Sequence, residues 1–452
     1  MREKFSPARW VLLIAGLGWF FDSLVIILFN VLVPQIKGSL HLGMAQVGLV
    51  ASLFLVGYTL GTLGGGTVSD YLGRRRTLSW SIVFYSLTTA LTATAGSLVS
   101  LGIWRSLTGL GGGMELPAAG TYVTEVHPGR TRGLGTGIMY SFYSLGAVAA
   151  SLLAVPFAGM AGGWRFAFAA CLVPGLLIWL ARRRLVESPR FDRVAELSRR
   201  TQVRPRISLR GVLAPRYRRD FLWRALAWVG TEWAYWSYAV YFPLFLMRQG
   251  HLTPQGLLLP LSLVYLGGAA LVVGSGYLCD RWGRCRVGVG FAAAGMAAMF
   301  LLTGTADPVL RWLAAVLVFG LFQGPWVAGL LATTEGFPTA IRGSATSAAL
   351  TVGRVAAMFA PAVTGFLAQT YSLQLAFRLG SLSLLLPLVG FVLAGETRGR
   401  PLSDVALTGW WPRAWEAFGH GTGWPAWAGE LAVRAADGGL SCDGTREAFV
   451  AA

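Results

Sequence analysis

The sequence predicts an all-α integral membrane protein with twelve transmembrane helices in two related six-helix halves. The chain is strongly apolar, with 54% hydrophobic residues, only 13% charged residues and a mean hydropathy of +0.57. Its apolar runs are long enough to cross a hydrocarbon core of about 30 Å as helices. A set of short motifs also recurs 210 residues further along the chain, which indicates an internal duplication.

Each expected span is an apolar run of about 20 residues, the length that a membrane-crossing helix needs. The spans fall at 10–34, 46–68, 77–95, 98–123, 134–158, 164–181, 220–246, 255–278, 287–305, 308–333, 344–368 and 374–394. Because the runs are continuous and do not alternate, they exclude a membrane β-barrel. The first run follows basic residues, as a secretory signal does, but it is longer than a signal core and no small-residue cleavage site follows it. We therefore expect it to be retained as a helix.

The spans group into two halves, residues 1–181 and 220–394. An arginine-rich segment without an apolar run, residues 182–219, is the predicted cytoplasmic linker between them. Residues 395–452 form a predicted cytoplasmic tail rich in Trp, Gly and Ala, which we expect to be disordered or to lie at the membrane interface.

The formal net charge of +18 is distributed unevenly along the chain. Most of the 38 Lys and Arg residues fall on one side of the membrane if the amino terminus is cytoplasmic. This positive-inside pattern predicts a multi-pass protein of the cell membrane with both termini in the cytoplasm. Anionic lipid headgroups are then the expected partner of the basic surface, and nucleic-acid binding is not needed to explain it. The arginine-rich, lysine-poor composition favours a prokaryotic source.

The four cysteines and four histidines are dispersed and have no metal-ligand spacing. Cys279 and Cys285 flank a loop that we expect to be cytoplasmic and therefore reduced. Without a catalytic or metal constellation, the chain is not expected to be an enzyme or to hold a cofactor. A membrane sensor without transport activity is a weaker alternative, because the tail does not resemble a folded signalling domain.

Two motif pairs carry the duplication. The stretch VSDYLGRRR at 68–76 is matched by LCDRWGRCR at 278–286, and TEVHPGRTRG at 124–133 is matched by TEGFPTAIRG at 334–343. Two halves related by an axis along the membrane normal are an architecture of secondary transporters, whose substrate site lies between the halves near the membrane midplane.

These motifs resemble a known family. GGGTVSDYLGRRR is similar to the signature between the second and third helices of the major facilitator superfamily, and the signature recurs between the eighth and ninth helices. RSLTGLGGG at 105–113, VESPR at 186–190 and GETRG at 395–399 resemble further motifs of that superfamily in the expected order. The resemblance covers about residues 10 to 400, and it implies transport by alternating access, driven here by a proton gradient.

A cytoplasmic gate is expected where the repeated motifs meet. An aspartate at a helix end can accept hydrogen bonds from the free N–H groups of another helix, and nearby arginines can pair with glutamates. The resemblance implies that this set parts when the transporter opens inward. In the alternative interpretation, the loops only anchor helix ends to lipid headgroups. The candidate gate residues are Asp70, Gly73, Arg74, Arg76, Glu125, Arg132, Asp280, Gly283, Arg284, Arg286, Glu335 and Arg342.

Charged residues inside the spans are costly and therefore candidates for function. Asp22 lies near the middle of the first span, and Glu232 occupies the duplicate position in the seventh. A carboxyl group removed from water can exist in its protonated form, so it can carry a proton reversibly. We assign Asp22, Glu232 and Arg105 to proton coupling and Arg354 to binding of a substrate carboxylate. An internal Asp22–Arg105 pair that only fixes helix packing is the alternative.

Aromatic and polar side chains near these charges complete the candidate substrate site. They can stack on a flat organic substrate, although ordinary helix packing explains them equally well. Besides Arg354, they are Trp19, Phe29, Tyr140, Tyr143, Trp228, Tyr235, Trp236 and Gln323.

The first span is similar to the corresponding helix of the aromatic acid:proton and related metabolite:proton symporters, through GWFFDSLVIILFNVLVP at 18–34. EGFPTAIRGSATSAALTVGRVAAMFAP at 335–361 resembles their tenth-to-eleventh helix segment. One departure is Val25, which stands where the aromatic-acid branch usually carries a second aspartate. The resemblance implies proton-coupled symport of a small organic anion, a carboxylate metabolite with or without an aromatic ring. We expect the protein to act as a monomer.

Sugar or polyol symport is the alternative substrate class, because VESPR and GETRG also resemble motifs of sugar porters. The seventh span, WVGTEWAYWSYAVYFPLF, lacks their glutamine-rich pattern. Drug efflux is less favoured, because the fifth span has no antiporter motif.

Overall fold

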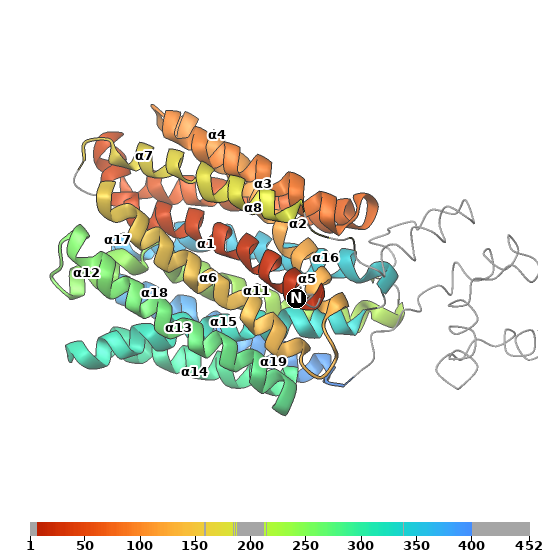
Figure 1. Cartoon of the computed structure of the whole chain (residues 1–452). Coiled ribbons are helices and arrows are strands. Elements are labelled where there is room, and N and C mark those ends of the chain that lie inside the picture. The colour runs from red at the N-terminus through yellow and green to blue at the C-terminus, as the bar shows by residue number, and fades with distance from the viewer. Residues whose placement is uncertain are drawn as a thin grey trace, which may run out of the picture.

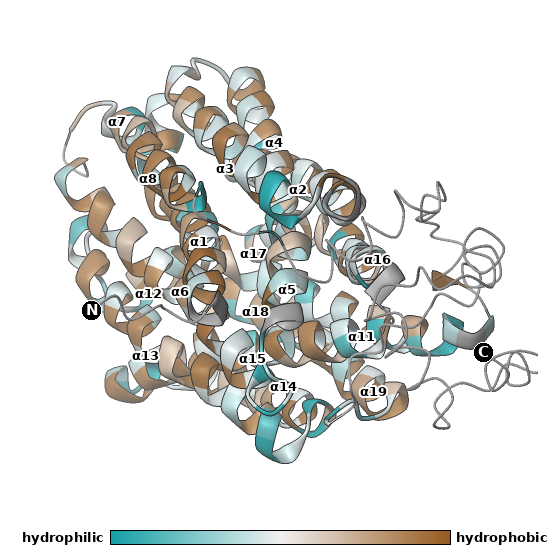
Figure 2. Cartoon of the chain, turned by 45° about the vertical axis from the view of Figure 1, so that its right-hand side comes forward, coloured by the Kyte–Doolittle hydropathy of each residue, from teal (hydrophilic) through white to brown (hydrophobic). Residues whose placement is uncertain are grey.

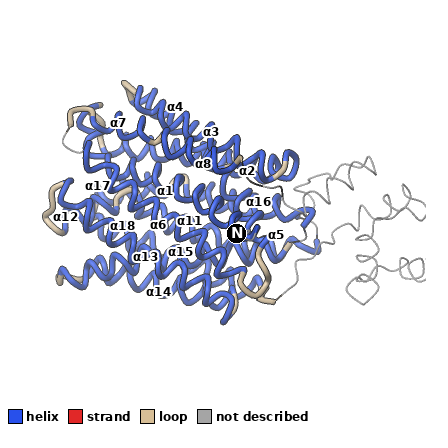
Figure 3. The backbone as a smooth tube through the Cα atoms, in the orientation of Figure 1, coloured by secondary structure: helices blue, strands red, loops and turns tan. Residues whose placement is uncertain are grey.

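The computed structural model describes residues 7–157, 160–183, 212–213, 215–337 and 339–399, together with positions 185 and 187; at some helical positions it describes the backbone alone. These residues form a bundle of α-helices and contain no strand (Figure 3). The helices are α1 (Pro7–Ser39), α2 (Met44–Leu72), α3 (Arg74–Leu91), α4 (Leu98–Gly113), α5 (Glu115–Val126), α6 (Arg132–Ala154), α7 (Gly163–Ala170), α8 (Leu172–Arg182), α11 (Pro215–Ala239), α12 (Phe242–Gln249), α13 (Pro254–Trp282), α14 (Arg284–Gly304), α15 (Pro308–Gly336), α16 (Thr339–Ala357), α17 (Ala360–Thr370), α18 (Leu373–Ser381) and α19 (Leu385–Ala394).

Nine helical stretches of the described chain are long and apolar enough to cross a membrane, and they coincide with nine of the predicted spans. The other three predicted spans are also helical. Residues 77–95 lie mainly in α3, 98–123 in α4 and α5, and 220–246 in α11 and α12. These helices carry more polar side chains or are interrupted, which explains their weaker apolar signal. The fold is therefore the predicted all-α membrane bundle.

The outer surface of the bundle is apolar. Large hydrophobic side chains project from it, including Trp80, Phe366 and Val309 at 71%, 66% and 77% exposure. Figure 2 shows hydrophobic residues along much of the length of the helices. Such a surface suits contact with lipid and would be unstable in water.

The helices of the first half, coloured red to yellow, gather mostly in the upper part of Figure 1, and those of the second half, green to blue, in the lower part. The halves meet where α6 packs along α13 and where α2 packs along α16 and α17. The predicted linker (182–219) and tail (395–452) lie largely outside the described residues, so those domain boundaries stay a prediction.

A glycine turns the chain between the helices at each copy of the first repeated motif. Gly73 separates α2 from α3 with a φ of 95°, and Gly283 separates α13 from α14 with a φ of 104°. Residues with a side chain rarely adopt this backbone conformation, so glycine is required at both corners. We call the end of the bundle that holds both corners the motif end.

The fourth predicted span is divided at Met114, between α4 and α5. Pro117 explains the interruption, because it has no N–H with which to bond the carbonyl of Gly113 one turn earlier. The Thr62 hydroxyl of α2 donates to that carbonyl at 3.1 Å instead. The break thus ties α4 to α2 close to the centre of the bundle.

Glycines at four-residue intervals bring α2 against α4. A Cβ atom placed on Gly57 would lie 1.9 Å from the carbonyl oxygen of Ser106. A Cβ atom placed on Gly61 would lie 2.1 Å from the carbonyl oxygen of Leu110. Because both obstacles are backbone atoms, neither can move aside without separating the helices.

We therefore predict that Gly61→Ala destabilises the protein by about 1–3 kcal/mol through overpacking. Gly64→Ala on the same helix is the matched control, because no atom lies within 4 Å of its added Cβ. Thermal unfolding in detergent should show a lower midpoint for Gly61→Ala and an unchanged or higher midpoint for Gly64→Ala. Equal midpoints for the two variants would show that the helix contact is looser than described.

Candidate functional site

Two tyrosines hold Asp22 at the centre of the first half. The Asp22 carboxylate accepts a hydrogen bond from Tyr58 Oη of α2 at 2.8 Å and one from Tyr85 Oη of α3 at 3.0 Å. All three side chains are buried. Gly112 of α4 leaves the space that the carboxylate occupies, because a Cβ there would lie 2.9 Å from Asp22 Oδ1. Asp22 is therefore fixed by neutral hydroxyl donors.

Arg354 connects the second half to this group. Its guanidinium lies over the Tyr58 ring, with Cζ 3.9 Å from the ring centroid, and its Nη1 donates to Thr62 Oγ1 at 2.6 Å. On its other side, Arg354 Nε lies 3.7 Å from Glu232 Oε1. The second Glu232 oxygen accepts from Trp236 Nε1 at 3.2 Å. The predicted residues Asp22, Glu232, Arg354 and Trp236 are thus brought together.

The contact between Arg354 and Glu232 is an ion pair without hydrogen-bond geometry. Neither Arg354 Nε nor Glu232 Oε1 has a hydrogen-bond partner among the described residues, although both atoms are buried. A carboxylate that accepted two parallel hydrogen bonds from a guanidinium would be held more strongly. Arg354 therefore has capacity for a second anion.

Arg105 is not paired with Asp22. Its guanidinium lies between two rings, with Cζ 4.6 Å from the centroid of Phe29 and 4.4 Å from that of Phe54. Its Nε and Nη1 are buried without a hydrogen-bond partner in the described structure. The alternative of an Asp22–Arg105 packing pair does not agree with this arrangement. Phe29, which the sequence analysis placed in the substrate site, therefore packs against the Arg105 guanidinium.

A cluster of aromatic rings spans the two halves beside these charges. Trp19 of α1 packs on Tyr140 of α6 with ring centroids 5.0 Å apart, and Trp326 of α15 packs on Tyr235 of α11 at 4.7 Å. Trp19 and Trp326 are themselves 6.3 Å apart, which joins the two pairs. Tyr143 and Tyr235 share a hydrogen bond of 2.7 Å across the halves.

Several polar atoms of this aromatic cluster lack a partner among the described residues. They include the indole nitrogens of Trp19 and Trp326 and the Tyr140 hydroxyl. The side-chain carbonyl of Gln323, about one turn before Trp326 on α15, also lacks a partner there. Trp228 differs, because its indole donates to Thr333 Oγ1 at 3.1 Å and thus has a structural partner. Buried polar atoms are normally satisfied, so the unpaired ones indicate a place for polar groups of a ligand.

The sequence did not single out Tyr58, Tyr85, Thr62 or Trp326. A tyrosine followed one turn later by the small residues Gly61 and Thr62 was an available signal for Tyr58. For Trp326, most of its neighbours along α15 are apolar, and the sequence offers no signal that distinguishes its ring from the other aromatic rings of this helix.

At the motif end, contacts cross between the halves through α6 and α13. Asp280 of α13 accepts from the backbone N–H groups of Gly133 and Leu134 at 2.9 and 2.8 Å, at the first turn of α6. A carboxylate there also complements the helix dipole. Beside it, Glu335 of α15 pairs with Arg132 of α6 at 2.9 Å, a second contact across the halves.

Glu335 also binds residues of its own half and is the centre of a buried ion cluster. Arg284 makes two hydrogen bonds to it, of 3.0 Å from Nε and 2.8 Å from Nη2. Thr397 Oγ1 adds a third at 2.8 Å. The predicted gate residues Asp280, Arg284, Glu335 and Arg132 therefore meet in one cluster.

The other predicted gate residues lie elsewhere at this end. Arg76 and Arg286 are exposed, whereas Arg74 and Arg342 are buried and donate to the backbone carbonyls of Ser69 and Thr334. The side chains of Asp70 and Glu125 lie outside the described residues.

Two glutamates cap the helices that follow the corner glycines. Glu187 accepts from the N–H of Arg74 at 2.9 Å, and Glu396 accepts from the N–H of Arg284 at 2.9 Å. Burial acts to raise the pKa of Glu396, but the backbone N–H groups that it binds outweigh burial and lower that pKa below its ordinary value of 4.5.

Glu115 belongs to the first half alone. Its carboxylate forms a buried ion pair with Arg182 of α8 and accepts from Ser81 Oγ at 2.9 Å. It therefore ties α5 to α8 and α3 and is not part of the cluster around Glu335.

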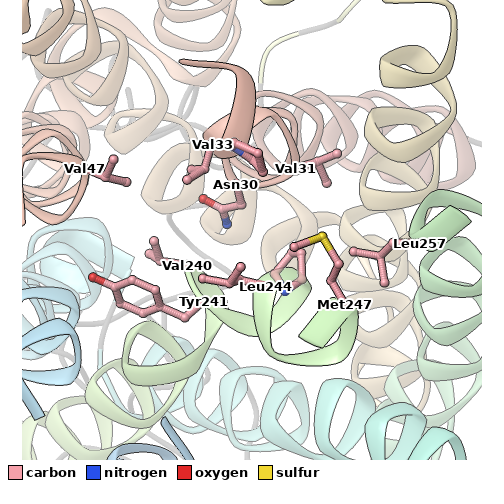
Figure 4. A pocket seen from close by; sticks show the side chains of 11 residues that line it. Asn30, Val31, Val33, Val47, Val240, Tyr241, Leu244, Met247 and Leu257 are labelled. Carbon is pink, nitrogen blue, oxygen red and sulfur yellow. The ribbon is translucent and has the colours of Figure 1, made fainter. Parts of the chain in front are cut away.

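At the opposite end from the motifs, two adjoining pockets lie between α1, α11–α12 and α13. They share Val31 and Pro34 in their walls. Figure 4 shows the first pocket, where Asn30 faces Tyr241 and Leu244 across the gap. Asn30 Nδ2 donates to the carbonyl of Ala239 at 3.3 Å and so joins the halves at the base of this region. The walls are uncharged.

Within the described residues, no group of three or more His, Cys, Asp or Glu side chains is placed to hold a metal ion. The charged and aromatic groups that the structure brings together are two carboxylates, two guanidinium groups and an aromatic cluster.

This combination defines a two-half helical membrane protein with charged groups buried between the halves. A family model described as Major Facilitator Superfamily matches residues 11–361. The chain belongs to this superfamily, which is a family of membrane transporters, and is not an enzyme.

Curated relatives agree with the predicted branch of aromatic acid and metabolite transporters. The chain is 28% identical over 427 residues to a niacin transporter of Acinetobacter baylyi, which covers 88% of this chain and 96% of the relative. It is 28% identical over 359 residues to a gentisate transporter of Corynebacterium glutamicum, and this match covers 78% of this chain and 80% of the relative.

Among solved structures, the chain is similar to the proton:xylose symporter XylE bound to 6-bromo-6-deoxy-D-glucose. The TM-score is 0.74 at 18% identity, and the match covers 88% of this chain and 98% of that one. At this identity the likeness shows the shared fold alone.

We predict that Asp280→Ala loosens the junction between α13 and α6. The backbone N–H groups of Gly133 and Leu134 lose a charged acceptor, so their hydrogen exchange should be about tenfold faster or more. Hydrogen–deuterium exchange measured by mass spectrometry on peptides covering 130–140 tests this. Asp307→Ala is the control, because Asp307 caps α15 at Leu310 with a similar bond of 2.8 Å. Unchanged exchange at 133–134 in Asp280→Ala would contradict the described contact.

Proposed function

We propose that this transporter couples the uptake of a small aromatic carboxylate to the movement of protons by alternating access. The observation that carries the proposal is the buried group formed by Asp22, Tyr58, Arg354 and Glu232, which crosses from one half to the other. It contains a candidate proton carrier, Asp22, and a candidate anion site, Arg354, which are both in contact with Tyr58.

Arg354 is the proposed binding residue for the substrate carboxylate. Its guanidinium is planar and can donate two parallel hydrogen bonds to a carboxylate. Glu232 is held at 3.7 Å without hydrogen-bond geometry, so a substrate can form better bonds to Arg354 than Glu232 does. Niacin and gentisate, named for the two relatives, are both aromatic carboxylates.

The aromatic cluster supports a flat substrate. Trp19, Tyr140, Tyr235 and Trp326 lie in mutual contact at the junction of the halves, so a ring that enters there can stack on them. The unpaired polar atoms of the cluster can then bond ring substituents. Sugar or polyol symport is not favoured, because a polyol needs many more polar partners and both curated relatives carry acids.

Asp22 is the proposed proton carrier. Glu232 and Arg105 are proposed to contribute to the same coupling between proton and substrate. Asp22 is buried on neutral donors, so it can exchange a proton without breaking an ion pair. Arg105 lies between Phe29 and Phe54 with unpaired nitrogens, and it supplies positive charge near the path.

Alternating access requires one end of the bundle to open while the other is closed. The cluster of Asp280, Arg132 and Glu335 joins the halves at the motif end and is the proposed cytoplasmic gate. The pockets beside Asn30 are the proposed route from the opposite side. Both termini are then cytoplasmic in the cell membrane of a prokaryote, with anionic lipids around the basic end and a monomer as the transporting unit.

Uptake into proteoliposomes tests the proposal. The panel is niacin, gentisate, benzoate, short aliphatic acids and sugars, each with and without an inward proton gradient. We expect gradient-driven accumulation of an aromatic acid. Asp22→Asn should abolish accumulation while sparing exchange of substrate across the membrane. Accumulation of a sugar, or acid uptake indifferent to the gradient, contradicts the proposal.

Arg354→Lys should raise the KM for the acid by about tenfold or more, because lysine cannot present two parallel donors to a carboxylate. Arg378→Lys is the matched control, since Arg378 bonds Thr303 at the periphery of the bundle. An unchanged KM in Arg354→Lys would place the anion elsewhere.

A further inference from the structure

Tyr58 contacts the proposed proton carrier and the proposed anion site at the same time. Its hydroxyl donates to Asp22 Oδ2 at 2.8 Å. The face of its ring lies 3.9 Å from Cζ of Arg354. The side chain is 3% exposed, so solvent does not mediate or screen either contact. A single residue of α2 therefore lies between a carboxylate of α1 and a cation of α16.

Tyr85 provides an internal comparison. It donates to the other Asp22 oxygen at 3.0 Å, and it is equally buried. Its ring packs edge-on against Phe21, with centroids 5.2 Å apart, and no contact between Tyr85 and Arg354 is present among the described residues. Asp22 thus has two similar hydrogen bonds, one of which comes from a ring that also binds the cation.

The other neighbours of Arg354 cannot replace Tyr58 in this position. Thr62 accepts from Arg354 Nη1 at 2.6 Å, but its own hydroxyl hydrogen goes to backbone carbonyls, those of Tyr58 at 2.8 Å and Gly113 at 3.1 Å. Glu232 lies on the second half and bonds Trp236. Among these groups, Tyr58 is the one in direct contact with the Asp22 carboxylate. Two other charged groups face Asp22, Arg105 of α4 and Glu115 of α5. Arg105 lies between Phe29 and Phe54, and Glu115 is paired with Arg182.

We propose that Tyr58 is the positioning residue that transmits anion binding at Arg354 to the proton on Asp22. The inference rests on the proposed function. A cation over a phenol ring withdraws electron density and makes the hydroxyl a stronger donor, which favours the charged carboxylate. When a substrate carboxylate neutralises Arg354 or draws it off the ring, this support weakens. Asp22 then takes up a proton more readily.

This direction of coupling is that of symport. The anion promotes protonation of Asp22, and by thermodynamic reciprocity a protonated Asp22 strengthens binding of the anion. The proton comes from the side to which the site is open and leaves on the other side when the anion departs. The link needs no movement larger than that of one guanidinium relative to one ring.

The experiment measures the affinity for radiolabelled niacin at pH 6 and pH 8 on purified full-length protein. Wild-type protein is expected to bind niacin about fivefold more tightly or better at pH 6. Tyr58→Phe keeps a ring under Arg354 but cuts the bond to Asp22, so its affinity should be the same at both pH values. Tyr85→Phe also removes one bond to Asp22 but leaves the link, so the pH dependence should persist, displaced along the pH axis.

Tyr58→Leu is the second variant, and it should lose the pH dependence as Tyr58→Phe does. A wild-type pH dependence in Tyr58→Phe overturns the inference while leaving the proposed function intact. Equal loss in Tyr58→Phe and Tyr85→Phe also overturns it, because hydrogen bonding to Asp22 in general would then be responsible. Wild-type binding that does not depend on pH contradicts the inference and the proposed coupling together.

Discussion

A charge inside a membrane protein must be compensated by other protein groups, because lipid provides none, and this constraint governs the centre of the bundle. Arg354 illustrates it. Its guanidinium rests on a ring from α2, bonds a hydroxyl from the same helix and faces a carboxylate from α11. No single helix can supply these partners, so the charge holds α2, α11 and α16 in register across the two halves.

The duplicated halves use the same frame for different chemistry. Asp22 and Glu232 occupy equivalent positions, yet hydroxyl groups surround the first and a guanidinium faces the second. The motif end is also uneven, because the described cluster around Glu335 gathers cations from both halves. Equivalent backbone geometry therefore does not make the two carboxylates equivalent in charge compensation.

The sequence predicted the features that depend on local pattern. Span positions follow from hydropathy, and the corner glycines follow from the repeated motif. Asp22, Glu232 and Arg354 were found because charge is rare in a span. Partners on other helices were harder to predict. Tyr58 bonds Asp22 only because α2 presents that face to α1, and this rotation depends on glycine contacts with α4 that a single sequence does not reveal.

The loose pairing of Glu232 with Arg354 has one more consequence. Glu232 carries the same functional group as the proposed cargo, so it acts as an intramolecular competitor that is present at a fixed, high local concentration. Such a competitor limits how tightly a carboxylate can be held and speeds its departure. A transporter must release its substrate in every cycle. Because Glu232 competes with the substrate for Arg354, it promotes this release without any further group.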